Sequence, residues 1–362
     1  MIRSYISLAT LCIAMVASAQ TTQRLSASKA NEYGVVYTLP INRLEVSIAA
    51  EKTVETPGEF YLYANKYLNT KPITATSTRW KLTEAVINPV AVADEEERYL
   101  VTLKGGNGIF IMVDGQNAPL SINDDSYKPM TVLDPIPEPR EAKPTILELP
   151  VARQAQTEEM LQSRSSVKRA EFAAAKIYEL RNNRNEVVSG QADAMPSDGN
   201  AMKIALSTID SQEEALTAMF IGTKATSIEV STFDFDIPSL DEAGQRTIIA
   251  RLSATKGLVD ADDLSGAPIY MTVTPVTTGK LPLNEKGEPK IFPKGGVAYR
   301  IPGSAEVTLE YDGKVIARKT INVAQYGEVF GVDPSLFTNK KAPSYARFDP
   351  MTGALLEIGE VR

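Results

Sequence analysis

The sequence predicts an α+β protein with two β-rich lobes, the C-terminal one sandwich-like, and a helical segment between them. Apolar and polar residues alternate near both ends of the chain, as in Leu44-Glu45-Val46-Ser47-Ile48, which is typical of half-buried strands. Residues 157–188 instead repeat apolar positions every three to four residues, as an amphipathic helix does. A proline-rich stretch separates the first strands from the helices.

Residues 1–19 are expected to be a signal peptide that is removed on export. Arg3 precedes an apolar stretch at 6–17, and Ala17-Ser18-Ala19 forms a small-residue cleavage site before Gln20. That stretch is shorter than the roughly 20 apolar residues needed to cross a bilayer. We therefore expect an exported protein of the periplasm or cell envelope, with no transmembrane segment after signal cleavage.

Residues 20–128 are predicted to form the N-terminal β-rich lobe. Strands are expected at 35–40, 44–48, 80–82, 86–87, 99–103 and 109–113. Pro57-Gly58 interrupts the strand pattern, and helical spacing of apolar residues predicts a short helix at 59–68. Residues 104–108, Lys-Gly-Gly-Asn-Gly, are expected to form a hairpin turn, because no helix start follows them as a phosphate loop would require.

Residues 129–150 are predicted to be an extended connector, because they contain Pro135, Pro137, Pro139, Pro144 and Pro150. A helical segment is expected at 151–222. Its two long helices are predicted at 157–188 and 201–220, with Ser211 and Glu214 as a capping box inside the second and Gly222 ending it.

Residues 223–362 are predicted to form the C-terminal β-sandwich-like lobe. Strands are expected at 228–230, 248–252, 269–273 and 307–311, and short strands at this spacing are typical of a sandwich or a barrel. Asp312-Gly313 between two such strands predicts a tight hairpin. Residues 349–353 are expected to form a turn between strands at 345–348 and 354–358.

Composition restricts the chemistry available to the chain. It has no histidine, and its single cysteine, Cys12, lies in the predicted signal peptide. Imidazole and thiolate perform much of the nucleophilic, acid–base and transition-metal chemistry near neutral pH, and no cofactor is expected. The net charge of −7 disfavours nucleic acid as a partner, and the sequence shows no polybasic run for anionic lipid.

Several short strings carry a resemblance to a known family. They include Val36-Tyr37-Thr38-Leu39-Pro40, Tyr63-Ala64-Asn65-Lys66-Tyr67-Leu68, Tyr299-Arg300-Ile301-Pro302-Gly303 and Ala324-Gln325-Tyr326-Gly327. In their order along the chain they resemble an uncharacterised exported bacterial family, domain of unknown function 4831. The resemblance implies export and an envelope location, and it brings no catalytic residues.

Two local motifs are candidate sites. Ser165 and Lys168 form a Ser-x-x-Lys pair, but the companion motifs of penicillin-recognising enzymes are missing, so we expect no catalytic role. Asp260, Asp262 and Asp263 resemble a fragment of a calcium loop. A solvated turn is the alternative for these three aspartates, because the full ligand spacing is absent. No catalytic or cofactor-binding residues are predicted.

The sequence favours a non-catalytic structural, adaptor or binding protein, with an envelope protein or a glycan as its partner. The alternative is a carboxylate-dependent glycoside hydrolase acting on envelope or dietary glycans, because that reaction needs only two carboxylates roughly 5 to 9.5 Å apart. Aromatic residues make up 7% of the chain, few for a sugar-stacking cleft. An acidic cleft with aromatic walls would favour the hydrolase.

Overall fold

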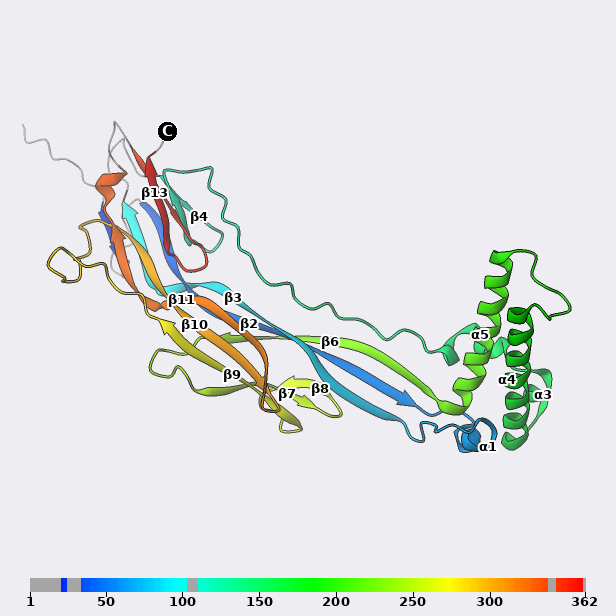
Figure 1. Ribbon diagram of the computed structural model, residues 1–362. Helices are drawn as coiled ribbons and strands as arrows, with labels where there is room; N and C mark the ends of the chain where they lie inside the picture. The colour runs from blue at the N-terminus through cyan, green and yellow to red at the C-terminus, as the bar shows by residue number, and fades with distance from the viewer. Residues whose placement is uncertain (1–20, 25–33, 103–109, 338–342, 361–362) are drawn as a thin grey trace, which may run out of the picture.

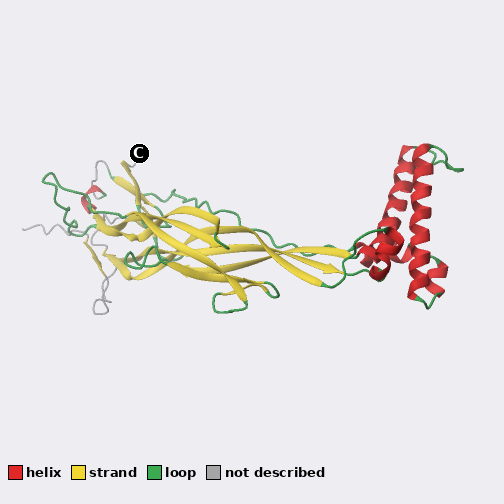
Figure 2. Cartoon of the chain, turned by 60° about the horizontal axis from the view of Figure 1, so that its bottom comes forward, coloured by secondary structure: helices red, strands yellow, loops and turns green. Residues whose placement is uncertain are grey.

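A computed structural model describes residues 21–24, 34–102, 110–337 and 343–360 (Figure 1). The molecule is elongated, with a β-rich body at one end and a group of helices, here called the head, at the other. Figure 2 shows that the long helices gather in the head, while long strands run from the body toward it. The α+β class predicted from the sequence is confirmed. The predicted signal peptide and the glycine-rich segment 104–108 lie outside the described residues.

The first sheet is antiparallel and has the strand order β1-β3-β2-β6. Its strands are β1 (Thr21–Arg24), β2 (Gly34–Thr56), β3 (Ser77–Thr102) and β6 (Thr223–Asp236). The pattern of alternation predicted several short strands here, whereas β2 and β3 are single long strands. β2 continues past Pro40 because the register with β3 shifts between Thr38 and Pro40, so the missing proline N–H interrupts the ladder only locally.

The second sheet has the order β11-β10-β9-β7-β8 and packs against the first. Its strands are β7 (Arg246–Ser253), β8 (Gly257–Asp260), β9 (Gly266–Thr277), β10 (Val297–Tyr311) and β11 (Lys314–Val332). Val46 and Ile48 of β2 share one hydrophobic core with Met271 of β9 and Val307 of β10. N-terminal and C-terminal strands therefore build the sandwich together.

A third sheet closes the end of the body farthest from the head, with the order β13-β12-β5-β4. It contains β4 (Ile111–Val113), β5 (Pro119–Ile122), β12 (Ser344–Phe348) and β13 (Leu355–Glu360). The two predicted turns of the C-terminal strands, at 312–313 and 349–353, are confirmed. Asp312 and Gly313 have φ angles of 50° and 70° between β10 and β11, and Gly353 N–H donates to the Asp349 carbonyl at 2.7 Å between β12 and β13.

The head contains five α-helices and two 3₁₀ turns among the described residues. These are the turns η1 (Tyr61–Tyr63) and η2 (Ile146–Glu148), and the helices α1 (Ala64–Leu68), α2 (Pro150–Gln154), α3 (Glu158–Gln162), α4 (Ser166–Ser189) and α5 (Gly199–Ile221). Their buried side chains, such as Phe60, Ala173 and Phe220, form a core of their own.

Two helix boundaries differ from the sequence prediction. The helix predicted at 157–188 is two helices, because Ser165 is extended and caps the N-terminus of α4. The predicted capping box at Ser211 is wrong, since the Ser211 hydroxyl donates to the Ser207 carbonyl at 2.8 Å inside continuous helix. Asp198 caps α5 instead, and Gly222 ends it as predicted, with φ 87°.

A three-stranded stalk, residues 51–56, 77–81 and 223–228, joins the body to the head. None of its residues is buried, and Trp80 at its body end packs on Gly257 of the second sheet. From Ile48, the last β2 residue in the sandwich core, the strand advances eight residues to Thr56. At about 3.4 Å per residue, this places the head roughly 27 Å beyond the sandwich core.

The connector, residues 129–150, runs from the body to the head as a fourth chain segment beside the stalk (Figure 1). It is extended up to Thr145, as its prolines predicted, before η2 and α2 begin. Asp134 exchanges two hydrogen bonds with the Asn88 side chain and pairs with Lys319 at 2.6 Å, which fixes the connector to the body. Nearer the head, Arg140 pairs through its backbone with Ile228 of β6.

Candidate functional site

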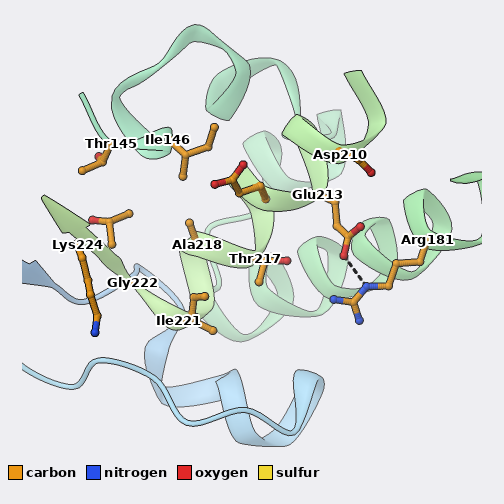
Figure 3. A pocket seen from close by; sticks show the side chains of 12 residues that line it. Thr145, Ile146, Arg181, Asp210, Glu213, Thr217, Ala218, Ile221, Gly222 and Lys224 are labelled. Atoms are coloured by element: carbon orange, nitrogen blue, oxygen red, sulfur yellow. Dashed lines mark hydrogen bonds and ion pairs between the residues drawn. The ribbon is translucent and has the colours of Figure 1, made fainter. Parts of the chain in front are cut away.

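A cavity of about 470 Å³ lies where the stalk meets the head, and we call it the neck cavity. Its walls come from α5, the start of β6, one residue of α4 and the start of η2 (Figure 3). The lining residues are Thr145, Ile146, Arg181, Asp210, Glu213, Glu214, Thr217, Ala218, Ile221, Gly222, Thr223 and Lys224. Three acidic and two basic side chains make this a charged cavity, and none of its lining residues is aromatic.

Two ion pairs link α4 to α5 along one side of the neck cavity. Arg181 Nε lies 2.6 Å from Glu213 Oε1, and Arg184 Nε lies 2.7 Å from Asp210 Oδ1. The arginines and the acids are each three residues apart, so each set shares one face of its helix. These pairs are partly exposed, and such pairs contribute about 0 to 1 kcal/mol each. The apolar packing of α4 against α5 brings these two charged faces together.

Two other polar side chains of the neck cavity, Glu214 and Thr217, make fewer polar contacts than Asp210 and Glu213. Glu214 is exposed and forms no ion pair within the described part of the chain. The Thr217 hydroxyl oxygen is buried and lacks a hydrogen-bond partner among the described residues. A buried hydroxyl without a partner is unfavourable, so Thr217 and Glu214 are the groups here that a bound molecule would contact.

Glu55 organises the stalk just below the neck cavity. Its carboxylate pairs with Lys224 of β6 at 3.0 Å, accepts a hydrogen bond from Ser77 of β3 at 3.1 Å, and pairs with Arg79. The hydrogen bond from Lys224 is the main cause that lowers the pKa of Glu55. Glu55 thereby ties the head-side ends of all three stalk strands. Figure 3 shows the Lys224 ammonium turned away from Glu213 and out of the cavity.

Gly222 makes the junction between α5 and β6 possible. Its φ of 87° is in the region that favours glycine. A Cβ atom here would lie 2.4 Å from the Thr56 carbonyl oxygen at the end of β2. The helix therefore turns directly into the stalk strand at a point where only glycine fits.

Most of the chain matches the model of a protein family. The model of domain of unknown function 4831 (DUF4831) matches residues 33–356. The chain belongs to the DUF4831 family. The match includes the body, the stalk and the head, and it confirms the resemblance drawn from the short sequence strings. Searches of curated proteins and of solved structures found no match.

The Ser-x-x-Lys pair of this DUF4831 chain has a structural role in the head. The Ser165 side chain accepts a hydrogen bond from the Lys168 backbone N–H at 3.5 Å as the cap of α4. Lys168 Nζ lies 2.9 Å from Glu171 Oε2, and this hydrogen bond raises the lysine pKa. A raised pKa favours the protonated amine, whereas a catalytic base must lose that proton.

The three candidate calcium ligands lie at the end of β8, which closes on Asp260, and in the turn to β9, which holds Asp262 and Asp263. Asp263 pairs with Lys256 at 2.8 Å and accepts a hydrogen bond from Ser265 N–H at 2.9 Å. The hydrogen bond from Lys256 is the main cause that lowers the pKa of Asp263. Across the described ranges, no three acidic side chains gather closely enough to hold a metal ion. The structure thus does not bring Asp260, Asp262 and Asp263 together as ligands.

The neck cavity was not predicted from the sequence. Its residues come from four segments whose contact depends on how α4 aligns with α5 and on where the connector reaches the head. The matched spacing of Arg181 and Arg184 with Asp210 and Glu213 was the one available signal. No helix among the described residues is both long and apolar enough to span a membrane.

Proposed function

We propose that this protein is an exported, non-catalytic adaptor or structural component of the periplasm or cell envelope, whose head and body contact different partners. The observation that carries this proposal is the stalk. It holds a helical head, with its own hydrophobic core, roughly 27 Å beyond the core of the sandwich. A protein that presents two separately packed units at a distance is suited to bridging two partners.

The composition of the cores supports the separation of the two units. The buried residues of the head core come from its helices and the segments joining them, and those of the sandwich core come from strands and the segment after β6. Between them the stalk has no buried side chains. Relative motion of head and body would therefore cost little buried apolar surface.

In the hydrolase alternative, acidic side chains of the neck cavity would be the catalytic carboxylates. Asp210, Glu213 and Glu214 line it, but arginines engage the first two. A glycosidase needs two available carboxylates on either side of the scissile bond. The cavity also lacks an aromatic side chain on which a sugar ring would stack. These features favour the adaptor over the hydrolase.

Site-specific photo-crosslinking in the native host tests the adaptor. A photoreactive residue would replace Ile204 on the head, which is 62% exposed, or Leu264 on the body, which is 82% exposed. We expect different envelope proteins to be captured at the two positions. Identical products at both positions would contradict the proposal that the head and the body contact different partners. Release of sugar from glycans by the purified protein, lost in Glu214→Gln, would support the hydrolase instead.

The proposed export has its own test. N-terminal sequencing of the protein from envelope fractions should begin at Gln20. A chain beginning at Met1, or one carrying lipid on Cys12, would contradict this part of the proposal.

A further inference from the structure

The loop between β9 and β10, residues 278–296, is exposed over most of its length, and we call it the lysine loop. It lies on the far side of the body from the helical head (Figure 1). The loop carries four exposed lysines, Lys280, Lys286, Lys290 and Lys294, and two glutamates. It therefore has a formal charge of +2 (4 − 2) in a chain whose net charge is −7.

The lysine loop is an ordered finger. Asn284 N–H donates to the Glu288 carbonyl at 2.8 Å, and Lys290 N–H donates to the Pro282 carbonyl at 2.8 Å. Leu283 and Pro289 face each other as a bridge between the two sides of the finger. At its base, Gly279 N–H donates to the Tyr326 carbonyl at 3.0 Å, which fixes the first side to β11.

The second side of the finger is fixed by an aromatic contact. The Phe292 ring lies edge-on to Phe330, with centroids 6.2 Å apart, and it packs so closely on Gly331 that a Cβ there would lie 2.8 Å from the ring. Because Phe292 is directed to the body, its neighbour Ile291 faces solvent. Ile291 is 90% exposed, the highest value among the large apolar side chains that the structure describes.

Two exposed aliphatic side chains lie close to the bridge of the finger. Leu283 is one member of the bridge, and Ile291 follows the other member, Pro289, by two residues. Leu283 is also 59% exposed. Exposed aliphatic side chains on a narrow tip among lysines are the combination that binds at a membrane surface, where apolar groups enter the interface and cations meet anionic headgroups.

We infer that the lysine loop docks the protein onto an anionic lipid bilayer. None of its four lysines forms an ion pair with any described residue, so all are available to headgroups. The lysines are spaced through the loop instead of forming a run, which is why the sequence showed no polybasic segment. Docking at this end of the body would direct the stalk and the head away from the bilayer. Membrane docking through the lysine loop does not require that the head has a partner.

Sedimentation of the purified chain, without residues 1–19, with lipid vesicles tests the inference. We expect the protein to bind vesicles of phosphatidylcholine mixed with phosphatidylglycerol and to bind pure phosphatidylcholine at least about ten-fold more weakly, since the attraction is electrostatic. Added salt should weaken the binding because it screens charge. Absence of binding to the anionic vesicles, or equal binding to both compositions, would overturn the inference.

Matched variants separate the contribution of the lysine charges from that of the exposed apolar side chains. Lys286→Glu with Lys290→Glu should abolish binding to the anionic vesicles, and Leu283→Ser with Ile291→Ser should weaken it several-fold. All four positions are exposed, so the melting temperature should stay unchanged. Lys314→Glu and Leu264→Ser, exposed positions on other parts of the body, are the controls and should bind like the unaltered protein. Loop variants that bind as well as these controls would overturn the inference.

Discussion

Asn42 and Gln325 lie 283 residues apart in the chain and exchange two hydrogen bonds. Asn42 N–H donates to Gln325 Oε1 at 2.9 Å, and Gln325 Nε2 donates to the Asn42 carbonyl at 2.8 Å. The Asn42 side chain also accepts from Ala324 N–H at 2.7 Å and donates to the Met351 carbonyl at 2.8 Å. One side chain thus joins β2, β11 and the turn before β13.

Asn42→Ala should lower the free energy of unfolding by roughly 2 to 4 kcal/mol, because it leaves the buried Ala324 N–H and the partly buried Met351 carbonyl without partners. Asn42 is only 1% exposed, so water does not replace the lost contacts. Urea unfolding followed by the fluorescence of Trp80, the single tryptophan, would measure the change. Asn182→Ala, exposed on α4, is the control and should be nearly neutral. Equal effects of the two substitutions would contradict the role of Asn42.

Glu55→Gln should lower the melting temperature at pH 7. Folding lowers the pKa of Glu55 below its ordinary value of 4.5, chiefly through the hydrogen bond from Lys224. The stabilisation is therefore present above that ordinary value and is lost as the pH falls through the lower folded pKa. Melting curves from pH 7 to pH 3 should show the difference from the unaltered protein shrinking. Glu84→Gln, exposed on β3, should show no such trend.

Gly313→Ala should destabilise the β10–β11 hairpin by about 1 to 2 kcal/mol, because an alanine at a φ of 70° is strained. The site itself is open: among the described residues, no atom beyond its chain neighbours lies within 4 Å of the added Cβ, so a steric clash does not contribute. Gly115→Ala is the matched control, since its site is equally open and its φ is not positive. Chemical denaturation that gives equal midpoints for the two variants would argue against strain at Gly313.

Ala173→Leu should destabilise the head by about 1 to 3 kcal/mol through overpacking, because Ala173 is fully buried against α5 and its neighbours. Helical circular dichroism should then melt at a lower temperature. Trp80 fluorescence should change little, because Trp80 packs on Gly257 at the body end of the stalk. Ala175→Leu, exposed on the same helix, is the control. A parallel loss in both signals would mean that head and body unfold as one unit.

Local sequence patterns predicted most of the elements but not their lengths. Alternation placed strands along β2 and β3, yet it does not reveal whether a proline ends a strand or only shifts its register, as at Pro40. The break before α4 followed from one cap, Ser165, within an otherwise continuous helical pattern. The Asp312-Gly313 hairpin was predicted correctly because its turn chemistry is local.

Local sequence patterns did not predict which side chains of the candidate sites come together. Asp260, Asp262 and Asp263 are neighbours in sequence, but Lys256 engages Asp263 and the three carboxylates do not converge. Arg181 and Glu213 are 32 residues apart and meet because of how α4 and α5 align. That alignment depends on the packing of the whole head, which no window of sequence contains.

The stalk also determines how the molecule would respond to tension. β2 and β6 are aligned over 14 consecutive residue pairs, from Arg43 to Thr56, without a register shift. A pull between head and body would act along these strands, so their hydrogen bonds would be loaded in shear and would have to break together. Four chain segments cross this region, counting the connector held at Arg140, so a single proteolytic cut there would leave the head attached.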